Sequence, residues 1–288
     1  MDRFPRTLVG GVSLSRLIIG SNWFLGCSHA TAAKDAFIKE NIADRRKIAD
    51  IIEVYLRAGV DTIMGKITNT VLAEGIAEAQ DRTGVGCIIV STPHFPVTPQ
   101  VPEKGFDMAE VDKILELNLK LGAKFCMPHQ AVTDALVDRC TRKIRWMEQL
   151  CARIREYGMI PGLSTHMPET MVYADETGLD VETYISIYNS LGFLMQAEVD
   201  WVCHLIRQSR KPVMTIKPMA AGLLRPLQGL TYVWNTIRPQ DMVAAGAMTP
   251  GEAAEVIEIS MSTLERRAAE VELQETRSKA SIKPSAAG

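Results

Sequence analysis

Short apolar runs alternate with longer amphipathic stretches along most of the 288-residue chain. The runs are rich in β-branched residues, as strands are, and the stretches between them have the apolar spacing of helices. The predicted strands are Leu17–Gly20, 60–64, Cys87–Ser91, Lys124–Met127, Ile160–Ser164, Ile185–Tyr188, Val213–Ile216 and Asp241–Ala245. Because strands and helices alternate, we expect the strands to form a parallel sheet.

The amphipathic stretches carry helix signals at their ends. One begins at the capping residue Asp44, and the longest are predicted over Thr133–Tyr157, over Gln196–Ser209 and from Pro250 to about Arg277. Several end at glycines that suit a left-handed cap, namely Gly59, Gly84, Gly122 and Gly158. The eight strand–helix units predict a (β/α)8 TIM barrel. A doubly wound sheet is disfavoured because no G-x-G-x-x-G follows the first strand.

The chain contains no evident linker between domains. We therefore expect a single barrel domain with an N-terminal hairpin over residues 1–277, followed by a polar C-terminal tail over residues 278–288. The chain is long enough for one barrel of about 250 residues.

The composition limits the classes of partner that the chain is expected to bind. The formal net charge is −2, which provides no overall positive field for nucleic acid or an anionic membrane surface. No apolar run reaches the roughly 18–20 residues needed to span a bilayer, and no secretion signal is recognisable. The six cysteines form no C-x-x-C pair, as in a reduced cytoplasmic protein. We expect a small-molecule substrate and leave a homo-oligomer open.

The candidate site follows from the barrel itself, since active-site residues of TIM barrels lie just past the carboxyl ends of the strands. Four of the five histidines fall in these loops, namely His29, His94, His129 and His166. Neutral imidazoles on neighbouring strands suit Zn²⁺, Mn²⁺ or Fe²⁺, so His94, His129 and His166 are candidate metal ligands. The other candidates for substrate or cofactor binding at these strand ends are Trp23, Thr92, Ser164, Asn189, Lys217 and Gly246.

Several segments resemble the aldo-keto reductases, in the same order as in that superfamily. They are RTLVGGVSLSRLIIGSNWFLG at the N-terminus, AGVDTIMGKITNTVLAEGIAEA, GLSTHMPETM, SIYN, IKPMAAGLL and AGAMTPGEAAEVIE. The resemblance implies the reductase-type barrel. It also implies a nicotinamide cofactor near Ser164, Asn189, Lys217 and Gly246, and a carbonyl substrate near Trp23, His29, Thr92, Asn189 and Lys217.

The catalytic residues of this superfamily are an aspartate, a tyrosine, a lysine and a histidine. The resemblance carries the aspartate to Asp61 and the histidine to His129, but Lys66 stands where the tyrosine is expected. The lysine at the third strand is replaced by Ser91 and Thr92. Hydride transfer to a carbonyl needs a proton donor at the developing alkoxide, so these replacements put ordinary reductase chemistry in doubt.

The segment near the cofactor's adenosine end has no Lys or Arg to pair with a 2′-phosphate, and Glu252 and Glu255 repel one. The sequence therefore disfavours NADPH and leaves NADH open.

Three hypotheses follow. The first is an enzyme of the lyase, isomerase or hydrolase type, which moves a proton on a small polar carbonyl or sugar-like substrate with or without a metal. Asp61, Lys66 and His129 are its expected catalytic residues. The alternative is a divergent NAD(P)H-dependent aldo-keto oxidoreductase. The second alternative is a non-catalytic barrel subunit.

Overall fold

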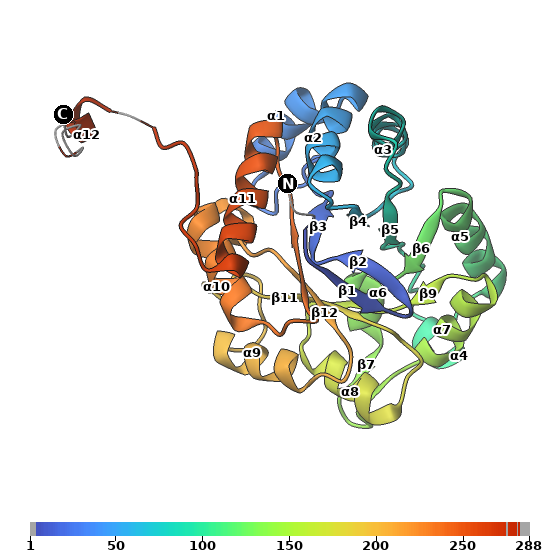
Figure 1. The fold of residues 1–288 in the computed structure, drawn as a ribbon. Coiled ribbons are helices and arrows are strands. Elements are labelled where there is room, and N and C mark those ends of the chain that lie inside the picture. Colours follow the sequence, from blue (N-terminus) through green and yellow to red (C-terminus); the bar gives the residue numbers. More distant parts are fainter. Residues whose placement is uncertain (1–3, 275, 281, 283–288) are drawn as a thin grey trace.

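A closed ring of parallel strands surrounded by helices forms the body of the computed structural model, which describes residues 4–274, 276–280 and 282 (Figure 1). In chain order the barrel strands are β3 (Leu17–Gly20), β4 (Thr62–Gly65), β5 (Ile88–Ser91), β6 (Ala123–Cys126), β9 (Ile160–Pro161) with β10 (Leu163–Thr165), β11 (Tyr184–Ile187), β12 (Val213–Ile216) and β13 (Met242–Ala245). All neighbouring pairs are parallel, and β13 pairs with β3.

The barrel closes within its fifth strand. β9 pairs with β6 and β10 pairs with β11, and only Gly162 separates the two segments. A Cβ at Gly162 would lie 2.7 Å from the carbonyl oxygen of Thr183 and 2.7 Å from Cε of Met127. Glycine therefore lets the fifth strand change partners, and the predicted (β/α)8 TIM barrel is confirmed.

Helices follow the barrel strands and cover the outside of the ring (Figure 1). The main ones are α2 (Arg45–Arg57), α3 (Thr70–Thr83), α5 (Met108–Lys120), α7 (Met147–Glu156), α8 (Glu169–Thr177), α9 (Val199–Gln208), α10 (Pro226–Thr236) and α11 (Pro250–Glu265). The other helical segments are α1 (Ala32–Ile42), α4 (Val101–Lys104), α6 (Gln130–Thr133), η1 (Asp134–Leu136), η2 (Ala220–Gly222) and α12 (Arg277–Ala280). No helix of the described residues is both long and apolar enough to cross a bilayer.

An antiparallel hairpin closes the amino-terminal end of the barrel. Its strands β1 (Arg6–Val9) and β2 (Val12–Ser15) are joined by Gly10 and Gly11, whose φ angles of +54° and +78° suit a tight hairpin turn. Val9 and Leu14 pack with the apolar side chains that fill the barrel interior. With this end sealed, the opposite end of the barrel is the place for a site.

The predicted helix over Thr133–Tyr157 is wrong in its first half. The structure has α6 and η1 there, then a small hairpin of β7 (Val137–Asp138) and β8 (Lys143–Ile144), and only then α7. The carboxylate of Asp138 accepts the backbone N–H groups of Cys140 and Thr141 and so builds a turn. Arg142 and Trp146 have left-handed backbone angles, which a continuous helix excludes.

The last predicted helix also ends early. α11 stops at Glu265, and Arg266 has a left-handed φ of +56°, so a helix to Arg277 is not formed. The division into a barrel over residues 1–277 and a polar tail over 278–288 stays a prediction. Residues 1–3, 275, 281 and 283–288 lie outside the described residues.

Candidate functional site

Basic side chains gather where the barrel strands end. The first three positions after the eight barrel strands, all of them described, contain no Asp or Glu. They do contain Lys66, His94, His129, His166 and Lys217, each following a different strand. We call these five residues, together with His29, the mouth cluster. The carboxyl end of the barrel thus combines several imidazoles and two amines, with no acidic residue in those first three positions.

The histidines of the mouth cluster lie within one another's electrostatic reach. The ring centroids of His94 and His129 are 6.3 Å apart. Burial lowers the pKa of His129, and the positive charges of His94, Lys217 and Lys66 lower it further. Burial, with added effects of Lys217, His129 and His29, lowers the pKa of His166 to about 4. Burial and neighbouring positive charges therefore favour the neutral forms of His129 and His166.

Lys217 is the most unusual member of the cluster. It directly follows β12 with a left-handed φ of +61°, a conformation rare for a residue with a side chain. Its amine makes no hydrogen bond or ion pair within the described part of the chain, although the residue is partly buried. Burial lowers the pKa of Lys217 to about 8, and Cys27 opposes this slightly. Strained backbone and an unpaired amine together mark a functional position.

The tautomer of His129 is fixed by its own loop. His129 is the N-cap of α6, and its Nδ1 accepts the backbone N–H of Ala131 at 3.2 Å. A neutral imidazole that accepts at Nδ1 carries its proton at Nε2. His129 is therefore a neutral hydrogen-bond donor at the mouth, suited to a carbonyl oxygen.

The loop after β3 brings His29 and Cys27 to the same place. Sγ of Cys27 lies 3.9 Å from Nδ1 of His29, whose backbone is left-handed with a φ of +58°. The pKa of His29 is lowered by burial and then by Lys217, and Asp35 opposes this shift. No role was predicted for Cys27, because a lone cysteine carries no spacing signal.

Trp23 and Gly246 are in contact. A Cβ at Gly246 would lie 2.5 Å from Cδ1 of Trp23, so the missing side chain lets the indole lie against the end of β13. This contact explains Gly246 without a cofactor. Nearby, the buried hydroxyl of Ser21 lies against Gly65 and has no hydrogen-bond partner in the described structure.

Asp61 lies at the opposite end of the barrel, so its predicted catalytic role is wrong. β4 begins at Thr62, and the residue before a strand belongs to its amino end. The carboxylate of Asp61 pairs with the guanidinium of Arg6, in the hairpin, at 2.9 Å. The sequence resemblance aligned the residue type but not the strand position.

The amide of Asn189 is largely used by its own loop. Its Oδ1 accepts the N–H groups of Leu191 and Phe193, and its Nδ2 donates to the carbonyl of Phe193. Asn189 is fully buried, and its predicted contacts with substrate and cofactor are left with one N–H hydrogen. The other two predicted residues, Thr92 and Ser164, lie at the ends of β5 and β10.

The predicted metal site at His94, His129 and His166 does not form. Among the described residues, no three His, Cys, Asp or Glu side chains are arranged to hold a metal ion. A metal ligand needs a free lone pair on its ring nitrogen. Nδ1 of His129 accepts the N–H of Ala131, so its Nε2 carries the proton and offers no lone pair to a metal ion.

Asp134, which positions His166, was not among the predicted site residues. Its partly buried carboxylate accepts the hydroxyl of Thr165 at 2.5 Å and the backbone N–H of His166 at 3.0 Å. Burial raises the pKa of Asp134. The prediction placed Asp134 inside a helix over Thr133–Tyr157. That placement gave no reason to expect hydrogen bonds from Asp134 to the fifth barrel strand.

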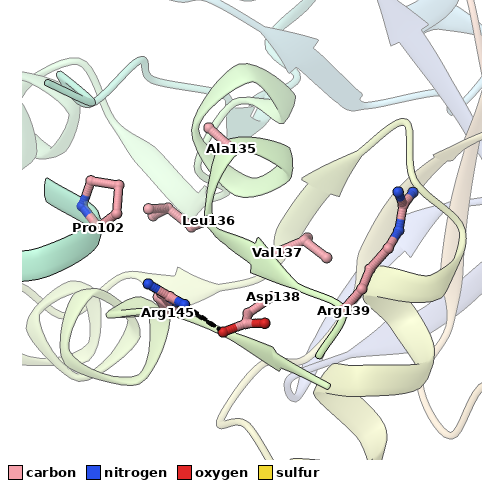
Figure 2. Close-up of a pocket in the computed structure, with 7 residues that line it drawn as sticks. All are labelled: Pro102, Ala135, Leu136, Val137, Asp138, Arg139 and Arg145. Carbon is pink, nitrogen blue, oxygen red and sulfur yellow. Dashed lines mark hydrogen bonds and ion pairs between the residues drawn. The ribbon is translucent and has the colours of Figure 1, made fainter. Parts of the chain in front are cut away.

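A second hollow lies beside the β7–β8 hairpin. It has a volume of about 290 Å³ and is lined by Pro102, Ala135, Leu136, Val137, Asp138, Arg139 and Arg145. Figure 2 shows the guanidinium of Arg145 reaching the carboxylate of Asp138, at 2.6 Å, whereas Arg139 points away from this pair. Arg139 pairs with Glu169. With both arginines paired, this hollow is a weaker candidate than the mouth cluster.

No known family model matches the chain, and a comparison with curated protein sequences finds no match. Solved structures do match over almost the whole chain. A Pseudomonas aeruginosa protein described as an aldo-keto reductase is 18% identical with a TM-score of 0.63, over 90% of this chain and 96% of its own. An aldo-keto reductase from Brucella melitensis is 14% identical with a TM-score of 0.58, over 90% and 93%.

A third match is an aldo-keto reductase from a Medee basin deep-sea metagenome library, 10% identical with a TM-score of 0.58 over 94% of this chain and 98% of its own. At these identities the likeness concerns the fold. The chain has the aldo-keto reductase type of (β/α)8 barrel, and the resemblance predicted from the sequence is confirmed at that level.

Proposed function

We propose that the chain is an oxidoreductase that interconverts a small polar carbonyl compound and its alcohol, with an unphosphorylated nicotinamide cofactor. The observation that carries this proposal is the mouth cluster, which puts the neutral donor His129 and the amine of Lys217 at the end of the barrel where such enzymes have their sites. Support comes also from the likeness of the whole barrel to proteins named as reductases.

The residues at the start of α11 do not fit the 2′-phosphate of NADPH. Thr249 accepts the N–H of Glu252 at 3.1 Å, and the carboxylate of Glu252 accepts the N–H of Met248 at 2.7 Å. This capping box uses donors that a phosphate needs and puts a negative charge in its place. NADH lacks that phosphate, and the buried hydroxyl of Ser21 together with Ser164 are the donors left for its amide.

The chain's own residues supply the proton chemistry, and a bound nicotinamide supplies the hydride. The N–H at Nε2 of His129 binds and polarises the carbonyl oxygen. Lys217, with a pKa of about 8, is mostly protonated at pH 7 and is a strong enough acid to donate to an alkoxide. Lys217 thereby takes the role of the missing tyrosine.

Cofactor titration tests the proposal. We expect NADH to bind at micromolar to millimolar concentration and NADPH to bind more weakly, with carbonyl-dependent NADH oxidation. Lys217→Met should lower kcat about 100-fold, as expected when a general acid is removed, and leave NADH binding nearly unchanged. Lys211→Met is the matched control, because Lys211 lies before the amino end of the same strand. No NADH binding at millimolar concentration would refute the proposal.

A second candidate is proton transfer without net redox change, of the isomerase or lyase type. The unpaired amine of Lys217 beside the neutral His166 favours it, because such a pair can remove and return a proton next to a carbonyl. Deuterium exchange from solvent into a ketone, in the absence of any nicotinamide, would support this candidate. Exchange that requires NADH would exclude it.

A further inference from the structure

We propose that the substrate is an anion, a carbonyl compound that carries a carboxylate or a phosphate bound by Lys217. The carbonyl rests on the proposed function, whereas the anionic group rests on the charges of the mouth alone. The five strand-end residues of the mouth cluster are all basic or imidazole groups, and the strand ends themselves hold no acid among their first three positions.

Three acidic residues near the mouth already have hydrogen-bond or ion-pair partners. The carboxylate of Asp134 accepts from Thr165 and His166, and Glu169 pairs with Arg139. Asp35 accepts both the hydroxyl and the backbone N–H of Ser28. None of the hydrogen bonds or ion pairs of these three carboxylates reaches Lys217, so they give its amine no counter-charge.

A partly buried ammonium without an ion-pair partner among the described residues is costly, since burial penalises the charged form and Cys27 offsets this only in small part. An anion beside Lys217 supplies that compensation and forms a charge-assisted hydrogen bond. The same anion is favoured by the other positive group at the mouth, the exposed Lys66, whose charge acts on His129. Binding of the anionic group at Lys217 is thus favourable before any group of the substrate reacts.

Lys217 also has the position that such a role needs. It acts electrostatically on His29, His129 and His166, so an anion on its amine lies among all three imidazoles. An ammonium has three N–H donors, so Lys217 can hold the anionic group and also donate to the carbonyl oxygen that the Nε2–H of His129 binds. A carboxylate or a phosphate would be bound by the same chemistry, and paired probes distinguish the two.

The test compares the binding of matched anionic and neutral probes by calorimetry, with pyruvate against hydroxyacetone and dihydroxyacetone phosphate against dihydroxyacetone. We expect at least one anion to bind tenfold or more tightly than its neutral partner. The pair that shows the difference identifies carboxylate or phosphate as the recognised group. Equal binding within both pairs, or no detectable binding of either anion at millimolar concentration, would overturn the proposal.

Two lysine substitutions test whether the preference for the anionic probe depends on Lys217. Lys217→Met should abolish the preference for the anion, and Lys211→Met should keep it. Equal losses in both variants, or none in Lys217→Met while its thermal unfolding stays cooperative, would contradict binding by Lys217. NADH titration separates this inference from the proposed function. Anion binding without NADH binding leaves only this inference standing, and NADH binding without anion preference leaves only the oxidoreductase.

Discussion

Charged side chains at the two ends of the barrel differ in whether they have hydrogen-bond and ion-pair partners. At the amino end, the fully buried carboxylate of Asp241 accepts the N–H of Val213 and three N–H groups of Arg238, and Asp61 pairs with Arg6. At the carboxyl end, the amine of Lys217 has no such partner within the described residues. Both ends contain partly or fully buried ionisable groups, but only one end satisfies them.

This difference separates stability from function. A buried charge that is fully hydrogen-bonded holds strands together, and its loss leaves partners unsatisfied. A buried charge without partners destabilises the folded protein and is available to a ligand. The comparison makes opposite predictions for substitutions at the two ends.

The largest effect is expected at the amino end. Asp241→Ala removes the acceptor for Val213 and Arg238 and leaves a partly buried guanidinium unpaired. We expect the free energy of unfolding to fall by about 3–5 kcal/mol. Urea unfolding measures this. A loss below about 1 kcal/mol would show that Asp241 is not a structural anchor.

A smaller effect concerns acid stability at the mouth. The pKa of His166 is about 4 in the folded protein, below its ordinary value of 6.5. The unfolded chain therefore binds more protons between pH 6.5 and 4, and stability falls as pH falls through that window. His166→Gln should remove about 2 kcal/mol of this fall, after an allowance for solvent screening. Unfolding of both proteins at several pH values tests it, and parallel curves would contradict it.

Lys217→Met is expected to stabilise the protein. Its pKa of about 8 lies below the ordinary value of 10.5, so the unfolded chain binds more protons between these values and wild-type stability rises with pH there. The variant lacks that rise and should be about 1 kcal/mol more stable at pH 7. Thermal unfolding at pH 7 and pH 10 is the measurement. A variant less stable than wild type at pH 7 would mean that the amine has a partner.

The smallest effect is expected for Asp61→Asn. The pair with Arg6 is partly exposed, and such pairs contribute about 0–1 kcal/mol. Because Asp61 lies at the far end of the barrel, we expect the anion preference at the mouth to change by less than a factor of about two, as independent sites do. Calorimetry with the paired probes checks this, and a large loss of the anion preference would mean that Asp61 contributes to the site.

The sequence was sufficient for the barrel and for the histidines at its mouth. Both depend on where strands end, and alternating patterns and terminal glycines mark those ends. It was not sufficient for Asp61, because the resemblance matched the type of this residue and not its place, which is before the amino end of β4. The hairpin within Thr133–Tyr157 depends on the turn at Asp138 and on left-handed residues, which apolar spacing does not reveal.

The state of Lys217 could be read only from the fold. A lysine after a strand is common on a protein surface, and its missing partner and burial are properties of the surrounding loops. The same holds for Asn189, whose amide is used by its own turn.

The most direct test of the account is an NMR titration of the Lys217 side chain, assigned by comparison with Lys217→Met. The account predicts a pKa of about 8 in the free protein and a rise when the preferred anionic probe is added. A pKa near the ordinary value of 10.5, unchanged by either anion, would contradict the claim that the mouth holds an unpaired amine.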